Sequence, residues 1–121
     1  MLRLRLRAVR EARGSIVAIG EDHSVPMPGW SSAVLRAHEE HPSAPAIVGC
    51  LVNSANESVS GRANFLAFAG PYVPPMPGVP NWRPPPLSTL SLKREVLDEL
   101  DERPGSLDSL ANRLFKEGRL T

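Results

Sequence analysis

Two carboxylates and an imidazole directly follow a short apolar run near the start of the chain. Glu21, Asp22 and His23, here called the acidic cluster, come after the apolar residues 16–19 and Gly20. Oxygen and nitrogen ligands in a row suit Mg²⁺ or Mn²⁺, which completes its coordination with water and substrate phosphates. A cation would also relieve the repulsion between the two carboxylates. The alternative interpretation is that Asp22 or His23 caps the turn into the next helix.

Other side chains with metal-binding or nucleophilic chemistry lie further along the chain. His38 and His41 are three residues apart near the end of a predicted helix, and we expect a structural or solvated role for both. Cys50 lies in an apolar stretch and is expected to be a small core residue rather than a nucleophile. The sequence contains no glycine-rich phosphate loop, nucleophile elbow or zinc-ligand spacing.

The segments around the acidic cluster predict a βαβ unit. Residues 16–19 and 46–52 are apolar runs rich in β-branched side chains, as expected for strands covered on both faces. Between them, residues 28–40 place apolar side chains at spacings of three and four, which predicts an amphipathic helix. We therefore expect an α/β, Rossmann-like fold with a parallel sheet and flanking helices. Ligands of such sheets bind beyond the carboxyl ends of the strands, where the acidic cluster lies.

The amino-terminal residues 2–13 alternate like a strand and also fit a helical stripe, and Gly14 favours a helix that ends there. This region holds one acid and five arginines, Arg3, Arg5, Arg7, Arg10 and Arg13. Such a composition is typical of a transit peptide, of a contact with an anionic surface or of a solvated helix face, and we favour the last. It lacks the long apolar core of a secretory signal, so we expect a cytoplasmic protein.

A proline-rich loop is predicted for residues 70–86, after a short predicted helix at residues 62–69. Proline removes backbone donors and fixes φ, so the loop is expected to be extended and outside any sheet. It could be a linker, a ligand for a proline-reading domain or a loop wrapped over a site. Only the last of these predicts that Tyr72, Trp82 and Arg83 face a pocket.

Two helices are predicted in the C-terminal part. Residues 93–100 offer an apolar face, with Arg94 and Asp98 paired on the outside. Residues 107–115 hold the clearest helical stripe, and we expect Ser106 as its N-cap and Gly118 as its stop.

One domain is expected over residues 1–121, because a chain of this length can bury a single core. Its content of 41% apolar and 22% charged residues is that of a soluble globular protein rather than of a disordered or membrane-spanning chain. The net charge of +1 predicts no general attraction to nucleic acid. Cys50 is the only cysteine, which excludes an internal disulfide and agrees with a reducing compartment.

The chain runs from REARGSIVAIGEDHSVPMPGW to AIVGCLVN, an aromatic helix, a proline-rich loop and LSTLSLKREVLDEL. This order resembles the middle and C-terminal part of family 2 glycosyltransferases of the GT-A fold. In that family a strand ends in a DxD-type acidic motif, EDH in one branch, and a Pro-x-Trp helix follows. A segment of the type N-x-S-x-(K/R)-R comes later. The resemblance covers roughly residues 8–120, without the family's amino-terminal, nucleotide-binding βαβ stretch.

The resemblance implies a metal-assisted, inverting transfer of a sugar from a nucleotide-sugar donor to an acceptor hydroxyl. The acidic cluster would stand at the DxD position and hold Mg²⁺ or Mn²⁺ against the diphosphate. Lys93 and Arg94 would lie in the acceptor-side segment with a cofactor-binding role, or else form a solvated helix start. Leu107 stands where the family has its general base. Asp108 is the nearest acid and would be either the catalytic base or a partner of the helix dipole.

The alternative to an enzyme is a non-catalytic α/β fragment or interaction module that has lost the donor-binding half. It predicts exposed apolar surface and a homo-oligomer or partner contact through an exposed sheet edge. A third hypothesis takes the amino-terminal arginines as a peripheral anchor to anionic membrane lipid or to RNA, with binding that weakens as salt rises.

Overall fold

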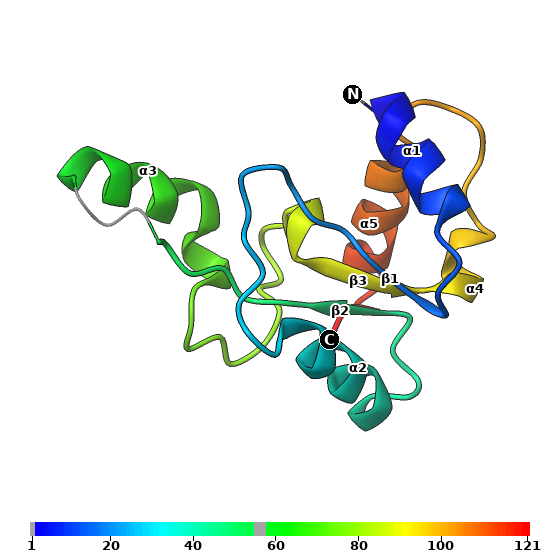
Figure 1. The fold of residues 1–121 in the computed structure, drawn as a ribbon, viewed down its shortest axis with the longest axis horizontal. Helices are drawn as coiled ribbons and strands as arrows, with labels where there is room; N and C mark the ends of the chain where they lie inside the picture. Colours follow the sequence, from blue (N-terminus) through cyan, green and yellow to red (C-terminus); the bar gives the residue numbers. More distant parts are fainter. Residues whose placement is uncertain (1, 55–57) are drawn as a thin grey trace.

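Helices and one small sheet alternate along the chain (Figure 1). The structure, a computed structural model, describes residues 2–54 and 58–121. The elements of these residues are α1 (Leu2–Glu11), β1 (Ile16–Ala18), α2 (Trp30–Glu40), β2 (Ala46–Val48), α3 (Val59–Ala69), the 3₁₀ helices η1 (Gly70–Tyr72) and η2 (Leu87–Thr89), β3 (Leu90–Lys93), α4 (Arg94–Leu97) and α5 (Ser106–Lys116). The fold is of mixed α and β type.

The sheet has the strand order β1-β3-β2, and β3 runs antiparallel to both neighbours. Val17 pairs with Leu92 on one side, and Ile47 pairs with Ser91 on the other. The predicted parallel sheet is therefore wrong. β1 and β2 do run in the same direction, because each is antiparallel to β3. A strand from the C-terminal part has entered between them and separates the predicted βαβ pair.

β3 was not predicted from the sequence, and its last residue, Lys93, falls within the helix predicted at residues 93–100. α4, Arg94–Leu97, is the part of that predicted helix that forms, so the prediction is right for these four residues and wrong for the rest. Leu90 and Leu92 are buried on one face of β3 and Ser91 on the other, because side chains alternate along a strand. A strand that is paired on both edges and covered on both faces is stabilised by its surroundings. This tertiary context outweighs local propensity.

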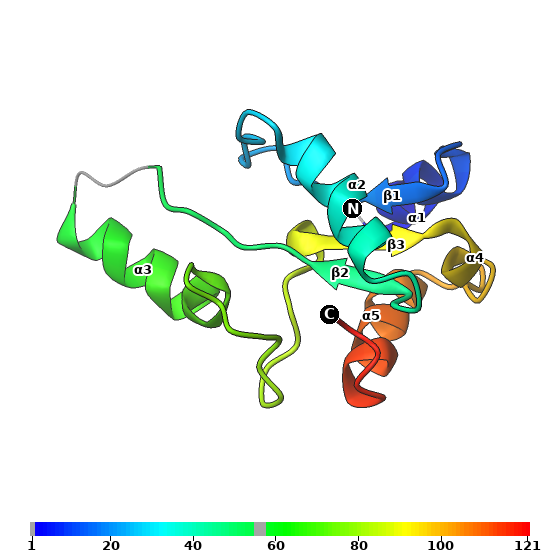
Figure 2. The same ribbon diagram turned by 90° about the horizontal axis from the view of Figure 1, so that it is seen from below.

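α2 and α5 cover opposite faces of the sheet, as Figure 2 shows. His38 of α2 contacts Ser91 on one face of β3. The buried leucines of α5 belong to the same apolar cluster as Leu90 and Leu92 on the other face. The core therefore lies mainly between the sheet and α5.

α5 confirms the predicted apolar stripe, because Leu107, Leu110, Ala111 and Leu114 are all buried. Its start differs from the prediction. The N-cap is Gly105, whose φ of 88° is in the left-handed region, and Ser106 lies inside the first turn instead of capping it.

Gly118 ends α5, as predicted, with a φ of 66°. Its amide donates to the carbonyl of Phe115 at 3.0 Å, and the amide of Arg119 donates to the carbonyl of Leu114 at 2.9 Å. These two bonds form a Schellman motif, which satisfies carbonyls that the helix end would otherwise leave without partners.

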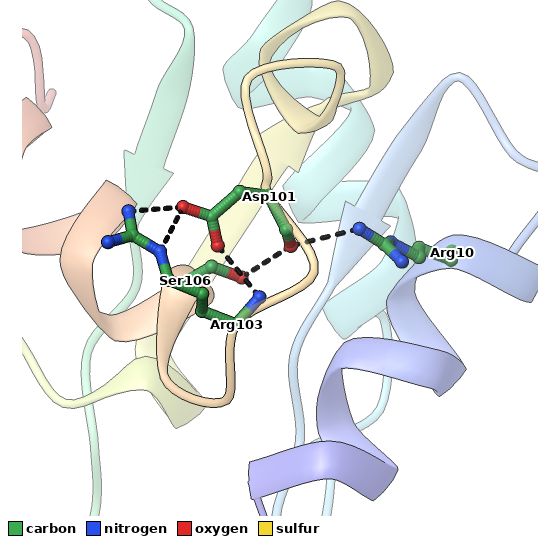
Figure 3. A network of polar contacts seen from close by, with 4 residues as sticks. All are labelled: Arg10, Asp101, Arg103 and Ser106. Carbon is green, nitrogen blue, oxygen red and sulfur yellow. Dashed lines mark hydrogen bonds and ion pairs between the residues drawn. The ribbon is translucent and has the colours of Figure 1, made fainter.

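Asp101 fixes the turn before α5 (Figure 3). Its carboxylate accepts hydrogen bonds from the amide of Arg103 at 2.9 Å and from the Arg103 Nε at 2.7 Å. These bonds hold the pKa of the Asp101 carboxyl below its ordinary value. The Asp101 carbonyl accepts from the hydroxyl of Ser106 at 3.1 Å and from the guanidinium of Arg10 at 2.9 Å. Because Arg10 belongs to α1, the network ties the first helix to the last.

α1 confirms the helical interpretation of the amino-terminal residues but ends at Glu11. Gly14 therefore lies beyond the helix, and it is not among the glycines with positive φ in the described residues. The prediction that Gly14 ends this helix is wrong.

The predicted strand at residues 46–52 stops at Val48. Cys50 comes after it and is exposed, so the prediction of a core cysteine is wrong. The end of the chain pairs with the outer edge of β2. The amide of Val48 donates to the carbonyl of Thr121 at 2.7 Å, and the amide of Thr121 donates to the carbonyl of Ala46 at 3.3 Å.

α3 extends away from the sheet in both views (Figures 1 and 2). After η1, residues 73–86 form neither helix nor strand, as predicted for the proline-rich loop. Within residues 2–54 and 58–121, no helix combines the length and the apolar character that crossing a membrane requires.

Candidate functional site

The acidic cluster lies in the turn that follows β1. The amide of Ile19 donates to the carbonyl of Leu90 at 2.9 Å, which continues the pairing with β3 just beyond the strand. The chain then turns, and the amide of Ser24 donates to the carbonyl of Glu21 at 3.0 Å. This turn places the three side chains together at the carboxyl end of β1.

His23 lies between the two carboxylates. Its Nε2 is 3.1 Å from the Glu21 Oε2, and its Nδ1 is 3.1 Å from the Asp22 Oδ1. The structure thus places His23 in contact with both predicted carboxylates. The hydrogen bond from His23 and the charge of its ring hold the pKa of the Asp22 carboxyl below its ordinary value, so Asp22 is an anion at neutral pH.

Arg5 of α1 joins the cluster, and sequence reasoning did not identify it. Its guanidinium lies 3.6 Å from the Glu21 Oε1. Only 17% of the Glu21 side chain is exposed, against 99% of that of Asp22. Five arginines precede the cluster in the sequence, and no spacing distinguishes the one that folds back onto it. Glu21 is thus held from two sides, and Asp22 faces solvent.

The donor set of the cluster suits a hard divalent cation, but its side chains do not surround a common point. Among the described residues, no group of three His, Cys, Asp or Glu side chains is placed to hold a metal ion. The guanidinium of Arg5 already offsets part of the charge of Glu21. Binding a cation by all three side chains requires them to rearrange around one point. The cation would take its remaining ligands from water and phosphate, as Mg²⁺ usually does.

Lys93 and Arg94 lie at the other end of β1 from the cluster. Lys93 pairs with Ile16 in the sheet. Glu21 is five residues beyond Ile16, a span of roughly 17 Å in an extended chain. The Lys93 Nζ donates to the carbonyl of Pro42. The guanidinium of Arg94 donates to the carbonyl of Gly14 at 2.8 Å and also to that of Ala12. Both cations therefore bind backbone carbonyls of this chain.

Asp108 lies in the first turn of α5 and is partly exposed. In the described parts of the chain, no hydrogen bond or ion pair joins it to the acidic cluster. Its position at the N-terminus of α5 agrees with the alternative interpretation, in which its charge interacts with the helix dipole.

His38 is buried against the sheet, with 5% of its surface exposed. Its Nε2 lies 2.9 Å from the Ser91 Oγ, and its Nδ1 has no hydrogen-bond partner among the described residues. Burial, assisted by the charge of Lys93, lowers the pKa of His38. His41 is exposed. These positions agree with the structural and solvated roles expected from the sequence.

The proline-rich loop does not turn Tyr72, Trp82 and Arg83 toward one pocket. Tyr72 is fully buried, and its hydroxyl donates to the carbonyl of Arg83. The guanidinium of Arg83 donates to the carbonyl of Ala67 at 2.9 Å. Trp82 is 71% exposed. The loop is thus anchored by Tyr72 and Arg83 but presents its tryptophan to solvent.

Comparisons with family models, with curated proteins and with solved structures found no match to this chain.

Proposed function

We propose that the chain is a partial GT-A-like domain of a family 2 type glycosyltransferase, which transfers a sugar from a nucleotide-sugar to an acceptor hydroxyl with inversion. The observation that carries the proposal is the contact of His23 with both Glu21 and Asp22 beyond β1, beside the guanidinium of Arg5. The order of α1, β1, cluster and α2 also follows the order of the motifs in that family. The single cysteine supports a reducing compartment, and we place the protein in the cytoplasm.

In this proposal Asp22 is the first ligand of Mg²⁺ or Mn²⁺, because its carboxylate is ionised and open to solvent. Glu21 and His23 complete the protein's share of the site. The cation supplies neutralising charge for the nucleoside diphosphate that leaves. Arg5 lies close enough to the cluster to add a second positive charge for a phosphate oxygen.

Arg94 supports the site from a distance in this proposal. By binding the carbonyls of Ala12 and Gly14, Arg94 fixes the connection between α1 and β1. α1 carries Arg5, and β1 leads into the cluster. Asp108 has no contact with the cluster, so the proposal routes no proton through it.

Calorimetric titration tests this function. We expect the wild-type chain to bind uridine or guanosine diphosphate in the presence of Mn²⁺ and to bind it at least tenfold more weakly with Mn²⁺ replaced by EDTA. Asp22→Asn, which keeps the shape of the side chain and removes its charge, should abolish the dependence on Mn²⁺. Asp98→Asn is the matched control, because Asp98 is exposed and lies in the turn after α4. Equal binding by the two variants would contradict the proposal.

A non-catalytic interaction module is the second candidate, and exposed apolar side chains favour it. Val25, Met27, Trp30 and Leu35 lie exposed on the loop before α2 and on α2 itself. The end of the chain covers the outer edge of β2, so β1 is the edge at which a second copy would pair. Light scattering tests this candidate. A concentration-dependent homo-oligomer without nucleotide binding would favour it, and a monomer that binds Mn²⁺ and nucleotide would exclude it.

A further inference from the structure

α3 is apolar around nearly its whole circumference. Its sequence is VSGRANFLAFA, in which only Ser60, Arg62 and Asn64 carry polar side chains. A surface helix of a globular protein usually has one apolar stripe facing the core and one polar face. A helix without that division is normally covered by protein or by lipid.

The described residues leave α3 largely uncovered. Ala69 is its only buried residue, whereas Val59 is 84%, Leu66 56% and Phe68 48% exposed. Figures 1 and 2 show α3 extending away from the sheet, with η1 following directly at its end. Transferring these side chains from water into apolar surroundings would lower the free energy in proportion to the apolar area that is buried.

The proline-rich loop follows α3 directly and presents Trp82 to solvent, whereas its Met76 and Val79 pack against the core. Trp82 is 71% exposed, and the loop contains eight of the thirteen prolines of the chain. Proline has no backbone N–H, so this stretch carries few donors that must be satisfied where water is scarce. Tyr72 and Arg83 bind the loop to itself and to the end of α3, which makes the two segments one structure. We call α3 together with residues 70–86 the apolar arm.

The charges of the apolar arm are all positive. The sequence has no Asp or Glu from Ser58 to Arg94, and the arm carries Arg62 and Arg83. Positive charge beside apolar and aromatic side chains suits the headgroup region of an anionic bilayer, where tryptophan is enriched.

α1 is less suited to this role, although it holds more arginines. Arg5 lies beside Glu21, Arg7 contacts Glu11 at 2.7 Å, and Arg10 lies 3.9 Å from Glu102. Each of these pairs reduces the positive charge that α1 presents to an anionic surface.

We propose that the apolar arm binds the surface of a bilayer that contains anionic phospholipid. α3 lies in the interface and does not cross it, because eleven residues make a helix of about 17 Å, against a hydrocarbon core of roughly 30 Å. The apolar side chains enter the boundary between headgroups and acyl chains, and Arg62 contacts lipid phosphates. This inference is independent of sugar transfer.

Vesicle binding of the full chain tests the inference. The probes are vesicles of phosphatidylcholine alone and of phosphatidylcholine with 30% phosphatidylglycerol, without metal or nucleotide. We expect sedimentation with the anionic vesicles, which weakens as NaCl is raised. In a Trp30→Phe background, Trp82 is the only tryptophan. Its emission should shift to shorter wavelength with anionic vesicles and be quenched by brominated acyl chains.

Matched variants locate the contact. Leu66→Ser should weaken vesicle binding about tenfold, whereas Leu35→Ser on α2, with 52% exposure against 56%, should leave it unchanged. Arg62→Gln should weaken it about fivefold, and Arg3→Gln on α1 should not. All four positions are on the surface, so circular dichroism should show an unchanged fold.

Three results would overturn the inference. The first is Trp82 emission that does not change with anionic vesicles. The second is a loss of binding with Arg3→Gln but not with Arg62→Gln, which would move the lipid contact to α1. The third is a lipid-free dimer that Leu66→Ser dissociates, with no vesicle binding by either form. That result would make a second copy of the chain the occupant of the apolar arm.

Discussion

Arg94 links the start of α4 to the connection between α1 and β1 through its side chain and its backbone amide. Its guanidinium binds the carbonyls of Ala12 and Gly14, and its amide donates to the carbonyl of Ser15 at 2.8 Å. A charged donor to a carbonyl is among the stronger hydrogen bonds, although partial exposure reduces its contribution. The loop from α1 to β1 is therefore held by a residue eighty positions further along the chain.

Removing this guanidinium should destabilise the fold without any ligand present. We expect Arg94→Gln to lower the free energy of unfolding by about 1–2 kcal/mol, measured by urea denaturation. Arg62→Gln is the control, because the Arg62 guanidinium has no hydrogen bond or ion pair with another described side chain. If Arg94→Gln is as stable as wild type and weakens only nucleotide binding, Arg94 is a ligand-binding residue and not a positioning one.

His38 should make stability depend on pH. Burial lowers its pKa in the folded chain below the ordinary value of about 6.5. The folded state therefore favours the neutral ring. Stability is complete above the unfolded pKa and is lost as pH falls through the folded pKa. Ser91 and Lys93, both on β3, are the polar and charged groups that face the ring.

Urea denaturation between pH 5 and 8 measures this effect. Wild type should lose stability toward low pH by at most about 1.4 kcal/mol per pH unit from this group. His38→Gln should remove that part of the slope, and His41→Gln, at an exposed position, should keep it. An unchanged slope in His38→Gln would show that other groups cause the dependence.

Residue chemistry predicted the acidic cluster but not its full composition. Three residues adjacent in sequence stay close in any turn, so Glu21, Asp22 and His23 could be grouped without a structure. Arg5 could not be added, because its approach depends on how α1 packs. Lys93 and Arg94 could not be placed for the same reason, since their partners are backbone carbonyls of distant segments.

At the scale of elements, periodicity predicted that α2 and α5 are helices, and each covers a face of the sheet. The predicted apolar stripe is buried only in α5, because His38 is the single buried residue of α2 and Trp30 is exposed. β3 was missed because Leu90–Lys93 is too short for alternation to be recognised, and its pairing is with strands distant in sequence. The antiparallel sheet follows from that one strand, so missing it made the predicted topology wrong.

The end of α5 allows a clean test of local conformation. Gly118 has a φ of 66°, and a Cβ added there would meet nothing within 4 Å. Any cost of Gly118→Ala is therefore conformational, and we expect a loss of about 1–2 kcal/mol in the free energy of unfolding. Gly78→Ala is the control, because Gly78 also has open space but no positive φ. Equal stability of both variants would show that the Schellman motif does not hold this helix end.

At the scale of the whole molecule, two surfaces carry different proposals. The acidic cluster lies at the end of β1, held by α1 and Arg94, and α3 of the apolar arm extends away from the sheet. The two binding activities can be tested independently, because vesicle binding needs no cation and nucleotide binding needs no lipid. A role of the protein as an enzyme depends on the acidic cluster.

Paramagnetic broadening by Mn²⁺ in the presence of nucleoside diphosphate is the direct test of a cation site at the acidic cluster. The chain has three histidines, so histidine labelling allows their imidazole protons to be followed by NMR. With substoichiometric Mn²⁺ and uridine or guanosine diphosphate, the His23 resonance should broaden first. Those of His38 and His41 should persist, and Asp22→Asn should prevent the effect. Broadening of all three resonances together, or of none, would contradict a cation site at the acidic cluster.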